Sequence, residues 1–194
     1  MKIKLLLLIT SVCMMNIATS QNDKLPYYEI PEASETYTAG TVVARMIDGL
    51  GFRFFWSTEG LRAEDLAFKP SEDGRTTGDT VDHILGLTNM IFNSAFNNKN
   101  KNFDSSKLSF DEKRVLTLTM LKKAADVFRA SDDLSQFKIV FNRDGQTSEY
   151  PFWNQINGPI ADALWHCGQV ITHRRTSGNP YNSNASVFTG TVKQ

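Results

Sequence analysis

Apolar residues recur at helical spacing in two segments of the N-terminal half of the chain. The first segment spans about residues 34–58, and the second begins with Thr77 or Asp79 as its N-cap and continues to about residue 97. From residue 83 to 98 there is no Lys, Arg, Asp or Glu, which indicates that the second helix is buried. The apolar faces comprise Val43, Ile47, Leu50 and Phe54 in the first segment and Val81, Ile84, Leu85, Ile91 and Ala95 in the second.

The next segment combines a third helix with a short β-structure. Ser109 and Glu112 form a capping box in front of an amphipathic helix over about residues 110–130. After this helix, apolar and polar residues alternate, and the dipeptide at residues 144–145 is Asp-Gly, a strong signal for a tight β-hairpin. The alternating apolar residues are Phe137, Ile139 and Phe141.

The last predicted helix begins at Trp153 or, if Pro159 marks its first turn, at Gly158. It ends at residues 177–180, Ser-Gly-Asn-Pro, because glycine terminates a helix and proline cannot continue it. Between Tyr150 and Arg174 the only charged residue is Asp162. A long helix with so little charge is expected to be largely buried, so its polar residues need partners.

Residues 1–20 are predicted to be a signal peptide. Lys2 and Lys4 precede an apolar run, and three small residues that end at Ser20 follow it. Cleavage there predicts an exported protein, periplasmic or secreted, and the apolar run is too short for a stable membrane anchor. The remaining residues, 21–194, suit a single domain, predicted to be an all-α four-helix bundle with a small β-hairpin excursion before the last helix.

Charge and cysteine content narrow the function classes. Removing Lys2 and Lys4 from 21 basic residues leaves 19 against 21 acidic ones, so nothing indicates nucleic-acid binding. Cys13 would leave with the signal peptide, and Cys167 would then be the single cysteine of the mature chain, which excludes an internal disulfide. Because Cys167 forms an apolar stripe with Ile160, Leu164 and Ile171 of the last helix, we expect it to be an inert core thiol.

The last helix carries the residues that favour chemistry. Asp162, His166, Gln169 and His173 follow one another at spacings of four, three and four, which puts them within about 60° of one another around the helix axis. If the second and last helices are adjacent, His83 converges with Asp162 and His166 into a set of two histidines and one carboxylate. Such a set suits divalent Zn, Ni, Fe or Mn and leaves coordination positions open.

Other interpretations of these residues stay open. A carboxylate four residues before a histidine also forms a simple buried ion pair, or a metal-free catalytic pair. Gln169 is expected to orient a ligand or to bridge helices, and His173 to line the site or to lie near the charged helix end. Structural roles are expected for three further groups: Phe152, Trp153 and Trp165 as core or pocket wall, Arg174 and Arg175 as a solvated last turn, and Val187 and Phe188 as docking points of the tail.

Two segments resemble the DinB-like (YfiT-like) superfamily of bacterial four-helix bundles. The first, EDLAFKPSEDGRTTGDTVDHILGL, is similar to the linker that enters the family's second helix with its single histidine. The second, ADALWHCGQVITHRRTSGNP, is similar to the family's signature in the fourth helix. The resemblance implies an up-down-down-up bundle with a metal site made by one histidine of the second helix and two histidines four residues apart in the fourth. His83 and His166 match this pattern, whereas Asp162 replaces the remaining histidine.

These observations predict an exported metal-binding protein with a small-molecule substrate, either a hydrolase or an enzyme similar to the thiol transferases among DinB-like proteins. Export makes a cytoplasmic thiol cosubstrate less plausible, because such thiols are concentrated in reducing compartments. The alternative is a noncatalytic binding or scaffold bundle with a metal-free polar network. In that case the uncharged helices would provide an apolar pocket or a homodimer face.

Overall fold

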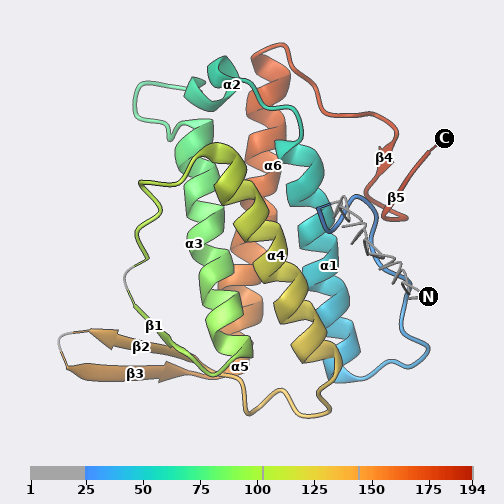
Figure 1. The fold of residues 1–194 in the computed structure, drawn as a ribbon, viewed down its shortest axis with the longest axis vertical. Coiled ribbons are helices and arrows are strands. Elements are labelled where there is room, and N and C mark those ends of the chain that lie inside the picture. Colours follow the sequence, from blue (N-terminus) through green and yellow to red (C-terminus); the bar gives the residue numbers. More distant parts are fainter. Residues whose placement is uncertain (1–24, 102, 144, 194) are drawn as a thin grey trace, which may run out of the picture.

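A computed structural model describes residues 25–101, 103–143 and 145–193. The predicted signal peptide lies outside the described residues. The described chain is mainly helical, as the sequence predicts, and it contains a three-stranded sheet, one strand more than the predicted hairpin, and a two-stranded sheet (Figure 1). Within these residues, no helix has both the length and the apolar character that crossing a bilayer requires.

The elements follow one another from helices to strands and back. The α-helices are α1 (Ala39–Thr58), α2 (Ala63–Ala67), α3 (Thr77–Ala95), α4 (Phe110–Arg129), α5 (Phe152–Gln155) and α6 (Ala161–Thr176), and the π-helical turn η1 (Ile156–Ile160) joins α5 to α6. The strands are β1 (Lys99–Asn100), β2 (Ile139–Arg143), β3 (Gln146–Tyr150), β4 (Ala185–Ser186) and β5 (Thr191–Val192).

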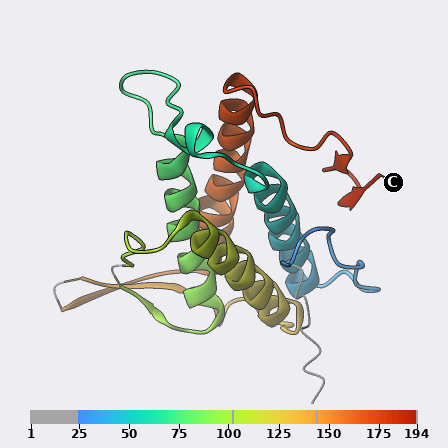
Figure 2. The same cartoon turned by 45° about the horizontal axis from the view of Figure 1, so that its top comes forward.

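The four long helices pack around a shared core. α1 contacts α4 and α6, and α3 contacts the same two helices, so the four form a closed ring (Figures 1 and 2). Side-chain contacts show the directions: Arg114 at the start of α4 reaches Thr58 at the end of α1, and His173 near the end of α6 reaches Thr77 at the start of α3. α1 and α6 therefore run upward in Figure 1, whereas α3 and α4 run downward.

The starts of the helices follow local capping chemistry. Ser109 Oγ accepts the N–H of Glu112 (3.3 Å) and the Glu112 carboxylate accepts the N–H of Ser109 (2.7 Å), so the predicted capping box is confirmed. Thr38 caps α1 in the same way, since its hydroxyl accepts the N–H of Thr41 (3.2 Å). α1 therefore begins several residues after the predicted start.

The predicted hairpin is confirmed and belongs to a sheet that ties it to α3. β2 and β3 pair antiparallel, and β1 adds to β2 in parallel. The side chain of Asn100 accepts a hydrogen bond from the Asn93 amide of α3 (3.0 Å) and donates one to the carbonyl of Val140 in β2 (3.1 Å). This buried amide fixes the sheet against the lower part of α3.

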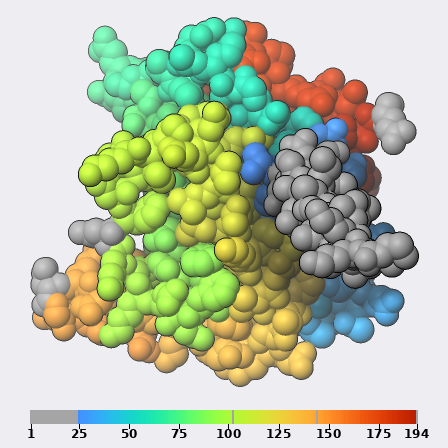
Figure 3. Space-filling view, viewed as in Figure 1, coloured from blue at the N-terminus to red at the C-terminus, as the bar shows by residue number. Residues whose placement is uncertain are grey.

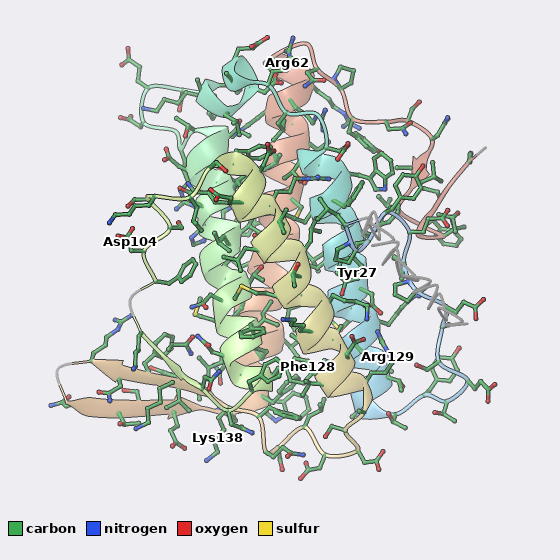
Figure 4. The ribbon with its side chains drawn as sticks, in the orientation of Figure 1. Tyr27, Arg62, Asp104, Phe128, Arg129 and Lys138 are labelled. Atoms are coloured by element: carbon green, nitrogen blue, oxygen red, sulfur yellow. The ribbon has the colours of Figure 1, made fainter. Side chains whose placement is uncertain are left out.

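The N-terminal segment covers the outer side of α1. The ring of Tyr27 lies over Gly51, where a Cβ would come within 2.3 Å of it, so only glycine fits there. The Tyr27 hydroxyl donates to Asp48 Oδ1 (3.1 Å), while Arg129 at the end of α4 donates to Asp48 Oδ2 (2.8 Å). Tyr27 and Arg129 thus bind one buried carboxylate of α1 from the N-terminal segment and from α4 (Figure 4).

The C-terminal tail forms the hairpin β4–β5 and packs on the same segment. The N–H of Ile30 donates to the carbonyl oxygen of Gly190 (2.8 Å), and a Cβ at Gly190 would collide with the Ile30 side chain. Ala185 is the buried contact of this tail. The prediction that Val187 and Phe188 dock the tail is wrong, because both are exposed, Phe188 almost completely. Backbone pairing, the close glycine contact and the partly buried side chains of Tyr181 and Val192 hold the tail against the core.

Two arginines bind the carboxyl end of α1, which has no basic residue in its own last turn. Arg174 of α6 donates to the carbonyl oxygens of Trp56, Ser57 and Glu59 at 2.9 to 3.1 Å. The guanidinium of Arg114 in α4 also lies at this end of α1. It donates a hydrogen bond to the Thr58 hydroxyl and lies over the Phe55 ring. The predicted solvated position of Arg174 is therefore wrong: it is 3% exposed and compensates the partial negative charge of the α1 terminus.

Asp65 in α2 joins the upper ends of the molecule. Its buried carboxylate accepts hydrogen bonds from Arg62, from Ser177 (2.6 Å) and from Asn179 (2.6 Å) just after α6. The bonds from Arg62 are the main cause that holds the pKa of Asp65 far below its usual range. This carboxylate connects the α1–α2 loop, near Arg62 in Figure 4, to the end of α6.

We predict that Asp65→Asn destabilises the protein by roughly 2–4 kcal/mol, because the buried hydrogen-bond donors lose their anionic acceptor. Since the folded-state pKa is lowered, the contribution of Asp65 is present above the unfolded carboxyl pKa of about 3.9 and is lost as the pH falls below it. Urea titrations at pH 7 and pH 3 measure both effects.

The control is Glu64→Gln, which removes an exposed partner of the same arginine. It should change the free energy of unfolding by less than about 1 kcal/mol. Equal destabilisation by the two variants at pH 7 would contradict the role given to Asp65.

Candidate metal centre

His83 of α3 meets Asp162 and His166 of α6, as the sequence predicts for adjacent helices. His83 Nε2 lies 3.3 Å from Asp162 Oδ2, and His166 Nε2 lies 3.2 Å from Asp162 Oδ1. The two imidazole rings are nearly perpendicular, with centroids 4.6 Å apart. One ligand atom from each residue lies within 4.8 Å of the others, so this group could hold a metal ion.

Asp162 owes its position to the π-helical turn that precedes α6. Pro159 lacks a backbone N–H, and Gly158 departs from helical geometry (φ −93°, ψ −105°), so the regular hydrogen-bond pattern changes here. The helix starts at Phe152, and η1 lies between α5 and α6, which differs from both predicted starts. Asp162 then falls in the first turn of α6, where the helix dipole favours a negative charge.

Gln169 orients His166. Its side-chain oxygen lies 2.7 Å from His166 Nδ1, one helical turn away. With Gln169 Oε1 as acceptor, Nδ1 carries the ring proton, and a neutral His166 presents a lone pair at Nε2. Nε2 is the atom that faces Asp162. The prediction that Gln169 orients a ligand residue agrees with this geometry.

The three side chains are partly accessible from outside. The side chains of His83 and Asp162 are 36% and 35% exposed, whereas that of His166 is 13% exposed. The Trp165 ring is nearly parallel to His166, with an interplanar angle of 14°, and most of it faces solvent. One side of the centre is therefore open to solvent. A further ligand could reach a bound ion from this side.

Of the aromatic group predicted to form a core or pocket wall, only Phe152 is in the core. It packs edge-on against Phe128, which lies at the lower end of the helices (Figure 4). Trp153 and Trp165 are 73% and 72% exposed, so neither is in the core. Trp153 lines a surface pocket together with Phe152 and Ile156, which agrees with the predicted pocket wall. Trp165 lies on the side of α6 opposite the buried Cys167 and therefore faces solvent.

α6 also faces the core differently from the prediction. The predicted apolar stripe ran through Ile160, Leu164, Cys167 and Ile171, but Leu164 and Ile171 are only half-buried. The buried face is rotated by roughly 60° from the predicted one, because α6 packs against α1 and α3 at once. The half-buried side chains of Asp162, His166 and Gln169 consequently lie at the edge of the α3–α6 contact. The buried residues of α6 are Ala163, Cys167, Val170, His173 and Arg174.

His173 lies apart from the centre. It is buried, its Nδ1 lies 3.1 Å from the Thr77 hydroxyl, and its ring packs near Phe68. Burial lowers the pKa of His173, which favours its neutral form. The seven residues that separate it from His166 correspond to about 10 Å along the helix. The hydrogen bond to Thr77 instead ties the end of α6 to the start of α3.

A groove opens beside His83, between α3 and the sheet. It encloses about 320 Å³. In Figure 3 the hairpin (orange) lies next to the segment that follows α3 (yellow-green). The groove was not predicted because the hairpin was expected to be an excursion from the bundle, although the alternation up to Phe141 already indicated one packed face. The lining includes His83, Leu87, Met90, Asn100, Lys101, Phe103, Phe141 and Arg143.

Comparisons with known proteins found no match among family models, curated protein sequences or solved structures. The functional argument therefore depends on the residues and their geometry.

We predict that Cys167 reacts slowly with thiol reagents in the folded protein. Its side chain is in the core, and burial raises the pKa of the thiol to about 12, so little thiolate forms at pH 8. Iodoacetamide labelling followed by mass spectrometry should be slower by roughly 100-fold or more in the native protein than in urea. Rapid labelling of the native protein would contradict the placement of this helix face.

Proposed function

We propose that this chain is an exported DinB-like protein, an up-down-down-up four-helix bundle, that binds one divalent metal ion through His83, Asp162 and His166. The ring of four long helices and their directions support the bundle assignment. The two segments similar to the family contain all three ligands. The signal-peptide pattern of residues 1–20 supports export.

The arrangement of His166 carries the metal proposal. With its proton on Nδ1 toward Gln169, the lone pair at Nε2 faces the Asp162 carboxylate oxygen at 3.2 Å. Two acceptors at this distance repel one another unless a cation lies between them. A histidine whose other nitrogen donates to a carbonyl oxygen is the usual second-shell arrangement of metal sites.

The donor set fits a first-row divalent ion. Bonds of about 2.0–2.2 Å place neighbouring donor atoms roughly 3–3.5 Å apart, close to the two nitrogen–oxygen distances at Asp162. Two imidazoles and a carboxylate suit Zn, Ni, Fe or Mn and leave room for an exchangeable ligand. Replacement of the family's histidine by Asp162 adds a negative charge, which favours the harder ions of this group.

Such a centre would suit a hydrolase, or a transferase similar to the thiol-dependent members of the DinB-like superfamily. A bound divalent ion would act as a Lewis acid or lower the pKa of a coordinated water or thiol. His83 and Asp162, the more exposed ligands, would hold the open side toward the substrate. Gln169 would keep His166 in the tautomer that binds, and Trp165 would shield the outer face of the ring.

The second candidate is a noncatalytic binding or scaffold bundle in which a proton takes the place of the metal. The nitrogen–oxygen distances of 3.2 and 3.3 Å also suit hydrogen bonds from the two imidazoles to Asp162. In this arrangement His166 must be protonated to donate from both nitrogens. Metal content then separates the two functions.

The decisive measurement is metal content after reloading the mature protein, prepared without a polyhistidine tag, with each candidate ion. We expect about one ion per chain by mass spectrometry and loss of binding in His83→Ala, because the site spans two helices. His173→Gln is the matched control, since this histidine lies outside the centre. No stoichiometric metal in folded wild-type protein would overturn the proposal.

We further predict that Gln169→Ala lowers metal affinity by roughly 10- to 100-fold without unfolding the protein, because His166 loses the group that orients it. Competition with a chromophoric chelator measures the change. Thr172→Ala, an exposed substitution on the same helix, should leave the affinity unchanged. Equal affinities of wild type and Gln169→Ala would show that this hydrogen bond does not support the centre.

A further inference from the structure

The groove beside His83 has walls from three separate parts of the chain. α3 contributes Leu87 and Met90, the segment after β1 contributes Phe103, and β2 contributes Phe141. Its volume of about 320 Å³ is at the lower end of the range that small-molecule sites occupy. His83 is part of both the groove and the candidate metal centre, so a molecule in the groove lies next to one of the three proposed ligands.

The charges on the groove are positive. Arg143 and Lys101 line it, and within the described residues neither takes part in an ion pair. Asp82 is the acidic residue of the described lining, and Lys113 of α4 already neutralises it at 2.7 Å. The groove therefore presents two cations to a ligand and one carboxylate whose charge is compensated.

Arg143 lies over an aromatic ring of the groove. Its guanidinium is 5.3 Å from the centroid of the Phe141 ring, because residues two apart in a strand share a face. A guanidinium can donate two hydrogen bonds to one carboxylate or phosphate, so Arg143 suits an organic anion. The aromatic ring beneath offers an apolar surface next to the charge.

The floor of the groove is rigid. Asn100 is 5% exposed, and its amide binds both Asn93 of α3 and the carbonyl of Val140 in β2. These two hydrogen bonds fix the spacing between the helix and the strand that carry the opposite walls. A preformed site of this kind loses little entropy on binding.

We propose that this groove binds an amphipathic organic anion, a small molecule with a carboxylate or phosphate at one end and a flat apolar body. The anionic end pairs with Lys101 and Arg143, and the body lies between Met90 and Phe141. That this molecule is the substrate rests on the metal centre proposed above, toward which its other end points at His83. Binding of the anion itself requires the groove alone.

The test uses the mature protein, first metal-free, with 3-phenylpropanoate as probe and the neutral 3-phenylpropanamide as its matched analogue. Isothermal titration and NMR shifts of groove residues should show the carboxylate binding at least about 10-fold more tightly than the amide, and more weakly as salt increases. The double variant Lys101→Gln, Arg143→Gln should lose about 10-fold in affinity for the carboxylate. Both residues are exposed, so circular dichroism should show unchanged folding.

Lys138→Gln is the control substitution. This lysine lies at the base of the hairpin, pairs with Glu149 at 2.8 Å, and is not part of the groove (Figure 4). It should bind the carboxylate as wild type does. Equal weakening by Lys138→Gln and by the double variant would overturn the proposal, because the effect would then reflect overall charge.

The outcomes separate this inference from the metal proposal. Carboxylate binding to metal-free protein supports the groove even if no metal ever binds. Absence of carboxylate binding, with or without metal, overturns the groove proposal and leaves the metal centre standing. Binding to metal-loaded protein alone, unaffected by the double variant, also overturns it, because the anion would then bind at the centre. Repeating the titration with phenyl phosphate distinguishes a carboxylate from a phosphate ligand.

Discussion

The binding of Arg174 to the carboxyl end of α1 is the interaction on which the rest of the structure depends. Its guanidinium accounts for three backbone carbonyls that α1 itself cannot satisfy, and it thereby fixes how far α6 extends along α1. Asp65 secures the same end of α6 through two residues that follow the helix. A slip of one residue would turn α6 by about 100° and carry Asp162 and His166 away from His83.

The candidate metal centre also depends on this distant restraint. It lies toward the start of α6, next to a π-turn that alone would leave the helix orientation loosely defined. Because the opposite end is fixed, the three side chains can remain 13% to 36% exposed without losing their mutual geometry. The same restraint leaves the open side of His83 facing the groove, where the sheet approaches α3 through Asn100. Rigid helix ends and an accessible centre are therefore parts of one arrangement.

Local sequence signals predicted the elements well. Ser109 and Glu112 determined the start of α4 by themselves, because a capping box needs only residues three apart. The Asp-Gly turn predicted the β2–β3 hairpin, and the spacing of four between Asp162 and His166 put both on one side of α6. β1 escaped prediction because a two-residue strand has no pattern, and Trp165 was misplaced because it lies about 160° around α6 from the buried Cys167.

The sequence by itself determined where the four long helices lie, where α3 and α4 begin, and which residue types are available for a metal. Backbone hydrogen bonds and side-chain periodicity are short-range properties, so residues a few positions apart suffice to specify them. Only the tertiary structure decided that His83 meets Asp162 and His166, that Arg174 is buried while Trp165 is exposed, and that a cationic groove lies beside the centre. These features depend on the rotation and axial position of whole helices, which packing between distant segments determines.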